Sequence, residues 1–96
     1  MSPVVVAKES WVSRKAFRLD VALVREDDGT WSAIVLNLPG TGSCGDTLED
    51  ALNNVREAFS AVAESYAAAH KEIPWKDSDG MDIPVGAVRK RIIVNA

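Results

Sequence analysis

The stretch Pro39-Gly-Thr-Gly-Ser-Cys-Gly-Asp46 decides the fold, because both segments beside it are strongly patterned. A hairpin signal precedes it, and about six turns of helical pattern follow it. Its proline cannot donate a hydrogen bond to a β-ladder and is predicted to end a strand. Its glycines allow the chain to turn sharply. A hairpin that leads into one helix through such a turn is a β-β-α unit.

The segment before this turn predicts a β-hairpin. Residues 16–26 alternate apolar and polar side chains, which is the period-2 pattern of a half-buried strand. Asp27-Asp28-Gly29 supplies the turn, since Gly29 can adopt a positive φ. Residues 30–38 are the predicted return strand. The apolar face of the first strand consists of Phe17, Leu19, Val21 and Leu23.

The return strand carries apolar side chains on both of its faces. Such a strand needs cover on both sides of its sheet, and one helix covers only one side. We therefore expect the outward face to be covered by something else, such as another subunit. We assign Trp31, Ala33 and Val35 to the outward face and Ile34, Leu36 and Leu38 to the helix face.

A single long helix is predicted over residues 47–70. Its apolar positions recur at i, i+3, i+4 and i+7 without a break. Asp46 or Thr47 caps its start, with an acidic residue three positions later in either case. Ile73-Pro74 ends it, because the residue before a proline disfavours the α region. The side chains predicted to face the sheet are Leu48, Leu52, Val55, Phe59 and Val62.

The remaining segments complete one small α+β domain. Residues 1–15 are predicted to be an N-terminal arm, and residues 16–96 a single domain. Residues 74–86 contain two prolines and two glycines and indicate a loop, while the β-branched run 88–94 indicates a late strand. With a short optional strand at 42–44, the order is β-β-(β)-α-β. The prediction is a three- to four-stranded antiparallel sheet packed by one long helix.

Charge is distributed unevenly along the chain, whose formal net charge is −3. Residues 26–88 carry twelve acidic side chains against three basic ones, and both ends are net basic. This pattern lacks the broad basic face of a nucleic-acid-binding domain and suits a basic protein partner better. The alternative is a solvated acidic surface. Arg89, Lys90 and Arg91 are expected to keep an edge strand soluble.

Compartment signals favour the cytoplasm. No apolar run is long enough to span a membrane, and the N-terminus lacks the pattern of a secretory signal. The single cysteine, Cys44, cannot form an internal disulfide, which fits a reducing compartment. We expect a cytoplasmic protein that does not contact a membrane.

No catalytic residue, metal site or cofactor is predicted. His70 and Cys44 have no neighbours in the sequence that would build a metal site or an activated nucleophile. Asp20, together with acidic residues of the helix, could bind a divalent metal as nuclease carboxylates do. We favour the alternative, in which Asp20 faces solvent and the helix acids complement the helix dipole.

The residues predicted to bind a partner are acidic or aromatic. The hairpin tip is expected to contribute carboxylates, and exposed tryptophans are enriched at interfaces. The alternative for Trp31 is ordinary packing. The predicted partner-binding residues are Asp27, Asp28, Trp31, Val35 and Trp75.

Taken together, residues 19–75 resemble the HicB-like antitoxin domain. The most specific part of the resemblance is the spacing from Leu38-Pro39-Gly40 to Gly45-Asp46-Thr47. The other parts are the alternating first strand, the acidic-glycine turn, the strand that starts at Trp31, and the helix closed by Ile73-Pro74.

This resemblance implies a partial ribonuclease-H-like fold without that fold's catalytic carboxylates. It implies a non-enzymatic protein that neutralises a small, basic, mRNA-cleaving toxin of the HicA type by direct contact. It also implies self-association, as a homodimer or a larger assembly. Many family members carry a further DNA-binding domain, but this chain stops after one late strand, so we expect a stand-alone member that does not bind nucleic acid. The alternative is a stand-alone oligomeric adaptor or structural protein with no toxin partner.

Overall fold

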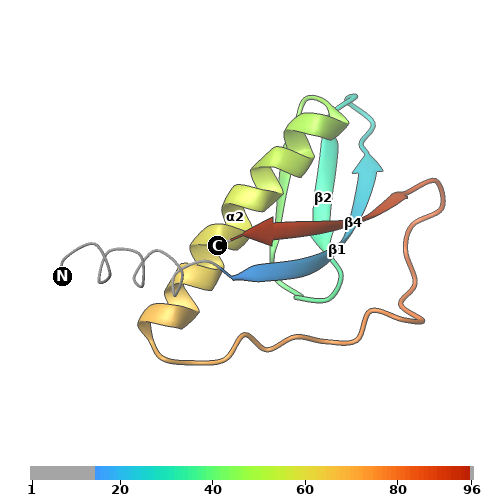
Figure 1. The fold of residues 1–96 in the computed structure, drawn as a ribbon. Coiled ribbons are helices and arrows are strands. Elements are labelled where there is room, and N and C mark those ends of the chain that lie inside the picture. The colour runs from blue at the N-terminus through green and yellow to red at the C-terminus, as the bar shows by residue number, and fades with distance from the viewer. Residues whose placement is uncertain (1–14, 96) are drawn as a thin grey trace.

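The computed structural model describes residues 15–95, which form four strands and one helix. All neighbouring strands pair antiparallel, in the order β3-β2-β1-β4, and the helix lies against one face of this sheet (Figure 1). The predicted α+β architecture is confirmed, including the optional third strand and the late strand. The arm predicted for residues 1–15 lies outside the described residues except for Lys15. The elements are β1 (Ala16–Arg25), β2 (Trp31–Val35), β3 (Gly42–Gly45), α2 (Leu48–Ala68) and β4 (Val88–Asn95).

The hydrophobic core lies between α2 and the facing side of the sheet. Leu19, Val21 and Leu23 of β1 are fully buried, as the alternation of that strand predicts. Val55 and Phe59 of α2 are also fully buried and pack on them. Burial of each such side chain stabilises the fold by about 1.5 to 3 kcal/mol. Leu48, Leu52 and Val62 are partly buried and pack around this cluster.

The prediction that Trp31, Ala33 and Val35 point away from the helix is wrong. Val35 pairs with Val21, and directly paired residues share a face of the sheet, so Val35 points toward α2. Ala33 and Val35 are accordingly 1% and 0% exposed, and Trp31 packs against the same core. Ile34, which is 45% exposed, points to the far side.

The strand β2 is also shorter than its sequence pattern indicates. It ends at Val35, and the backbone then turns, with Leu38 N donating to Val35 O and Thr41 N donating to Leu38 O. Pro39 therefore lies in the second of these turns and does not end the strand. The apolar side chains of Leu36 and Leu38 are buried, but they belong to this turn and do not follow the two-residue period of a strand.

The end of α2 depends on a residue with a left-handed backbone. His70 has a φ of 54°, and its N–H donates to Ala67 O. Lys71 N donates to Tyr66 O at 2.9 Å, which completes a Schellman-type ending. The helix thus stops at Ala68, before the Ile73-Pro74 signal, and His70 has a structural place in the fold.

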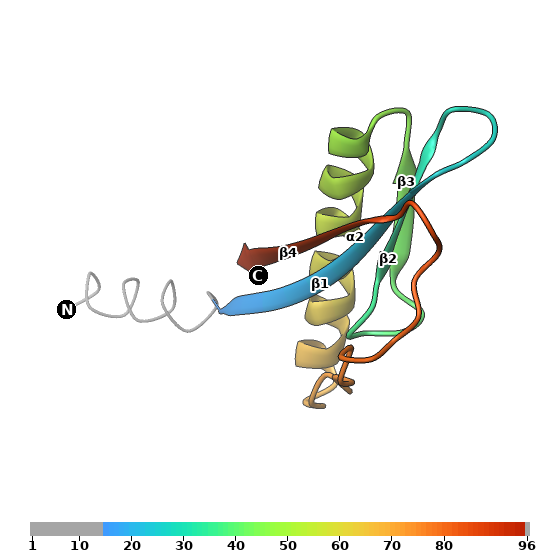
Figure 2. The same ribbon diagram turned by 90° about the vertical axis from the view of Figure 1, so that its right-hand side faces the viewer.

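The chain itself covers part of the far face of the sheet. The segment 69–87 leaves the end of α2 and returns to β4 on the side of the sheet away from the helix (Figure 2). Lys76 N donates to Asn37 O at 2.9 Å, and Ser78 Oγ donates to Asp20 Oδ2 at 2.6 Å. Because of this cover, no second subunit is needed to shield the centre of β1.

Asp20 is the charged centre of this covered region, and the prediction that it faces solvent is wrong. It is 5% exposed, since Arg89 of β4 and Ser78 of the covering segment both bind its carboxylate. Arg89 Nε donates to Oδ1 at 2.9 Å, and Nη2 donates to Oδ2. The guanidinium of Arg89 lowers the pKa of Asp20 to about 2, although burial acts in the opposite direction.

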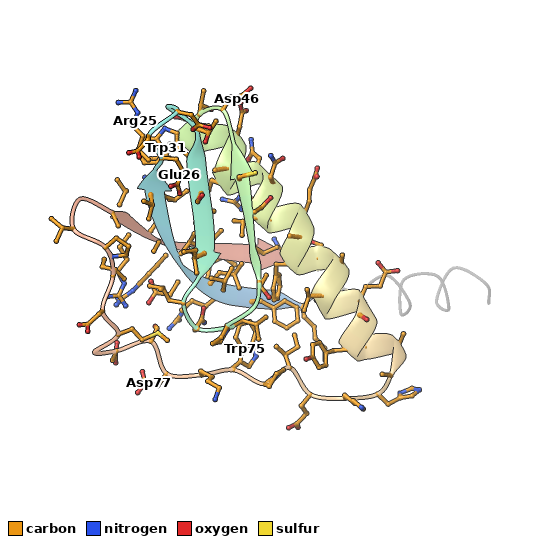
Figure 3. All side chains as sticks on the ribbon, turned by 180° about the vertical axis from the view of Figure 1, so that it is seen from behind. Arg25, Glu26, Trp31, Asp46, Trp75 and Asp77 are labelled. Carbon is orange, nitrogen blue, oxygen red and sulfur yellow. The ribbon has the colours of Figure 1, made fainter. Side chains whose placement is uncertain are left out.

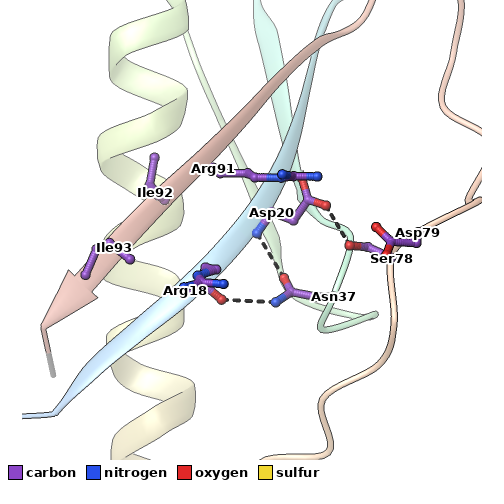
Figure 4. A pocket seen from close by; sticks show the side chains of 8 residues that line it. All are labelled: Arg18, Asp20, Asn37, Ser78, Asp79, Arg91, Ile92 and Ile93. Atoms are coloured by element: carbon purple, nitrogen blue, oxygen red, sulfur yellow. Dashed lines mark hydrogen bonds between the residues drawn. The ribbon is translucent and has the colours of Figure 1, made fainter.

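Asn37 continues the hydrogen bonding of β1 where β2 has ended. Its Oδ1 accepts from Asp20 N at 3.0 Å, and its Nδ2 donates to Arg18 O at 3.0 Å (Figure 4). Leu36 N donates to Asp20 O at 2.7 Å. One amide side chain thus satisfies two backbone groups that would otherwise lack a strand partner.

The paired Asp20 predicts a specific acid sensitivity. Its folded pKa of about 2 lies below the ordinary value of 3.8, so its stabilisation is complete above about pH 5 and is lost as the pH falls toward 2. This shift corresponds to about 2.5 kcal/mol of unfolding free energy at pH 7 and about half of that at pH 3. Asp20→Asn should therefore lower stability by about 2 to 3 kcal/mol at pH 7, measured by urea unfolding.

The difference between wild type and Asp20→Asn should shrink at pH 3. The matched control is Asp82→Asn, which removes an exposed carboxylate and should change stability by less than about 0.5 kcal/mol. A loss for Asp20→Asn that is no larger than that of the control would contradict the stabilising role of this ion pair.

Candidate partner-binding surface

Three strand ends meet side by side at one end of the sheet. Arg25 at the end of β1 pairs with Trp31, and Trp31 pairs with Gly45 at the end of β3. The β1–β2 turn and the start of α2 therefore lie at the same end of the molecule. Figure 3 shows Arg25, Glu26, Trp31 and Asp46 gathered there.

Gly45 allows the start of α2 to approach β3 closely. A Cβ at this position would lie 2.4 Å from Ala51 N and 2.7 Å from the carbonyl carbon of Asp50. Both contacts are with backbone atoms, so only glycine fits without a shift of the helix. Of the two predicted caps, Thr47 is the one used, because its Oγ1 accepts from Asp50 N at 3.0 Å.

This arrangement places the carboxylates of two separate segments at the same end of the sheet, and we call this region the acidic end. All six of its carboxylate residues are exposed. Within residues 25–31 and 45–51, Arg25 is the only basic side chain. The acidic end consists of Glu26, Asp27 and Asp28 from the β1–β2 turn, and Asp46, Glu49 and Asp50 from the start of α2.

Two of these carboxylates are held in place by neighbours on the hairpin. Asp28 Oδ1 accepts from Thr30 N at 2.9 Å and from Thr30 Oγ1 at 2.6 Å. These hydrogen bonds lower the pKa of Asp28, so it is ionised at neutral pH. Glu26 Oε2 accepts from Ser32 Oγ at 2.7 Å. The hairpin thus presents negative charge in a fixed geometry.

The predicted partner-binding residues are only partly brought together. Asp27 and Asp28 belong to the acidic end, and Trp31 lies at its base, half-buried against the core. Val35 is fully buried beneath α2, so its assignment to a surface is wrong. Trp75 lies at the opposite end of the molecule (Figure 3).

Trp75 packs in an aromatic group and remains partly open to solvent. Its ring centroid lies 6.1 Å from that of Phe17 and 5.8 Å from that of Phe59, and its exposure is 40%. It closes the core below the C-terminal half of α2. It therefore lies apart from the acidic end.

The sequence prediction missed half of the acidic end. The sequence predicts Asp46 only as a candidate helix cap, and it predicts Glu49 and Asp50 only as partners of the helix dipole. These three residues lie near the hairpin because Trp31 of β2 pairs with Gly45 of β3. That register follows from the strand order, which sequence spacing alone does not reveal.

The carboxylates that a metal-dependent nuclease would need do not lie together. The Asp20 carboxylate lies on the far face of the sheet and is already paired with Arg89, whereas the acidic residues of α2 lie on the other side. Among residues 15–95, no group of three or more His, Cys, Asp or Glu side chains is placed to hold a metal ion. Within the same range, no helix has both the length and the apolar character needed to cross a membrane.

The fold and its motifs define a family. Residues 19–82 match the family described as HicB_like antitoxin of bacterial toxin-antitoxin system. The chain belongs to this HicB-like antitoxin family, and the resemblance of residues 19–75 is confirmed.

Similar proteins come from distant organisms. The chain is 36% identical over 64 residues to UPF0150 protein ssr1765 of Synechocystis, a match that covers 67% of this chain and 81% of that protein. It is 30% identical over 63 residues to UPF0150 protein Ta0767 of Thermoplasma acidophilum, covering 66% and 91%. Its fold is similar to that of the N-terminal domain of Burkholderia pseudomallei antitoxin HicB. That match has a TM-score of 0.68 and 23% identity, and covers 79% of this chain and 95% of the other.

The close approach at Gly45 predicts a costly Gly45→Ala substitution. The added Cβ must push the first turn of α2 away from β3, and we expect a loss of about 2 to 3 kcal/mol by urea unfolding. Amide hydrogen exchange at residues 48–51 should also accelerate. The control is Gly86→Ala, where a Cβ meets open space and only the positive φ costs about 1 kcal/mol. Equal losses for both variants, with unchanged exchange at 48–51, would show that the contact is unimportant.

Proposed function

We propose that this protein is an antitoxin-like binding module that neutralises a small, basic, mRNA-cleaving toxin of the HicA type by direct contact. The acidic end is the proposed contact surface. The observation that carries the proposal is that two segments far apart in the sequence place six exposed carboxylates at one end of a chain of this family. In this proposal the protein has no enzymatic activity of its own and requires no cofactor.

Electrostatics favour this surface for a basic partner. Carboxylates grouped on one surface attract a cationic protein over the distance of a Debye length, which is about 10 Å at 0.1 M salt. Trp31 adds a partly exposed aromatic surface at the base of the acidic end. Aromatic side chains surrounded by charge are frequent centres of binding energy at interfaces.

In this proposal the toxin is neutralised because the carboxylates of this chain compete with RNA for the basic side chains of the toxin. A toxin that cleaves mRNA must present basic side chains to the phosphates of its substrate. Carboxylates that occupy those side chains exclude the RNA, so binding alone suffices to block cleavage. This mode of action places the protein in the cytoplasm, where the mRNA is. It requires no contact between this chain and nucleic acid.

A second candidate is an oligomeric adaptor with no toxin partner. It is favoured by two exposed apolar side chains on the far face of the sheet, Ile34 at 45% and Ile93 at 53% exposure. Self-association belongs to both candidates. A small basic protein encoded next to this chain, which binds it when the two are produced together, would favour the antitoxin over the adaptor.

Neutralising part of the acidic end should weaken toxin binding. The triple variant Asp27→Asn, Asp46→Asn, Glu49→Gln removes three exposed charges that make no side-chain hydrogen bonds within residues 15–95. At 0.1 M salt, Kd for the basic toxin encoded beside this chain should rise at least tenfold, measured by calorimetry. The rise should largely vanish at 1 M salt, where charges are screened beyond about 3 Å.

The matched control removes the same charge elsewhere. Glu72→Gln, Asp77→Asn, Asp82→Asn also changes three exposed carboxylates, all outside the acidic end. Its Kd should change less than threefold. Equal weakening by both triple variants would mean that net charge alone, and not the acidic end, governs binding.

A further inference from the structure

The strand β4 presents the long open edge of the sheet. It is eight residues long and, within residues 15–95, lies at the end of the strand order with β1 as its one strand neighbour (Figure 1). The opposite edge, β3, has four residues and carries the start of α2 beside it. An open edge of this length offers unpaired backbone groups to another strand.

The hydrogen bonds of β1 define which groups of β4 face outward. Asp20 directs its N–H and C=O toward Asn37 and Leu36, on the β2 side. Its partner across the ladder, Arg91, is therefore not bonded to β1 and directs its own N–H and C=O to the open edge. The same holds for every second residue of β4. Consistent with this, Ile93 O accepts a hydrogen bond from Arg56 Nη1 of α2 at 3.3 Å. The outward residues are Arg89, Arg91, Ile93 and Asn95.

The two halves of β4 differ in charge and in polarity. The first half contains Arg89, Lys90 and Arg91, and the second half is apolar around Ile93, which is 53% exposed. A basic partner strand would meet repulsion along the first half. A second copy in antiparallel orientation instead places the basic half of each strand against the apolar half of the other.

We propose that β4 pairs antiparallel with β4 of a second copy of this chain, around a two-fold axis at Ile92. Outward residues must face outward residues, so the axis passes through a single residue position. An axis at Lys90 or Arg91 would bring that basic side chain opposite the same side chain of the other copy. With the axis at Ile92, Arg91 lies opposite Ile93 and Lys90 opposite Val94 of the other copy.

A groove between α2 and β4 favours this register. It has a volume of about 580 Å³ and is lined by Val94, by the basic side chain of Arg56, and by the acidic side chains of Glu57 and Glu64. Lys90 pairs with Val21 and so lies on the helix side of the sheet. In the proposed pair, Lys90 of each copy lies next to Val94 of the other, beside these carboxylates. Because the groove carries two carboxylates and one guanidinium, it is net acidic, and this favours Lys90 of the other copy on both sides of the two-fold axis.

This inference builds on the self-association included in the proposed function and requires no toxin. It is tested with the purified chain alone, so its failure would leave the toxin contact at the acidic end unaffected. The acidic end and β4 belong to different parts of the sheet, separated by β1. A pair formed through β4 would carry two free acidic ends.

The first test is the mass of the chain in solution. By size-exclusion chromatography with light scattering at about 100 µM, wild type should be a dimer. Ile93→Lys, which adds a charge at the edge, should raise the dimer dissociation constant at least tenfold. Ile34→Lys makes the same change at an exposed side chain of the same face, away from the edge, and should remain dimeric. A wild-type monomer at this concentration, or equal effects of both variants, would overturn the proposal.

The second test fixes the register. Residues at the two-fold axis form a non-hydrogen-bonded pair with Cα atoms about 4.5 Å apart, a distance that a disulfide can bridge. In a Cys44→Ser background, Ile92→Cys should give a covalent dimer under mild oxidation, while Ile34→Cys should stay uncrosslinked. Circular dichroism checks that both variants are folded. No covalent dimer from a folded Ile92→Cys variant would contradict the axis at Ile92.

Discussion

The close approach of Gly45 to the first turn of α2 is the constraint on which the functional arrangement depends. It fixes the start of the helix beside the end of β3, where a Cβ would meet the backbone at 2.4 Å. Because Gly45 also pairs with Trp31, the helix start and the β1–β2 turn are brought to one end of the sheet. Packing and backbone register therefore place six carboxylates at the same end of the sheet, although their like charges repel one another.

A second set of interactions closes the far face and explains what remains open. The Asp20 carboxylate joins Arg89 of β4 to Ser78 of the segment 69–87, so the chain covers the centre of its own sheet. Asn37 closes the edge of β1 beyond the end of β2. Within residues 15–95, these contacts leave the outer edge of β4 without a strand neighbour. Each of the two proposed surfaces is thus a place where the internal contacts of the fold stop.

The sequence predicts the elements that depend on local periodicity. The alternation of β1 and the spacing of Val55 and Phe59 in α2 correctly identify the two sides of the core. The predicted orientation of the β2 side chains is wrong because the apolar pattern continues through Leu36 and Leu38, whereas these two residues lie in a turn. The burial of Asp20 depends on a residue 69 positions away, and no local pattern carries that information. The acidic end was half predicted for the same reason, since its two parts are joined only by strand register.

The proposed contact can be mapped by amide hydrogen exchange of the chain, with and without the basic toxin that we propose as its partner. We expect protection on binding to be concentrated in residues 25–31 and 45–51, on both sides of the Trp31–Gly45 pair. Protection confined to the segment 69–87 around Trp75, with the acidic end exchanging as in the free chain, would contradict it.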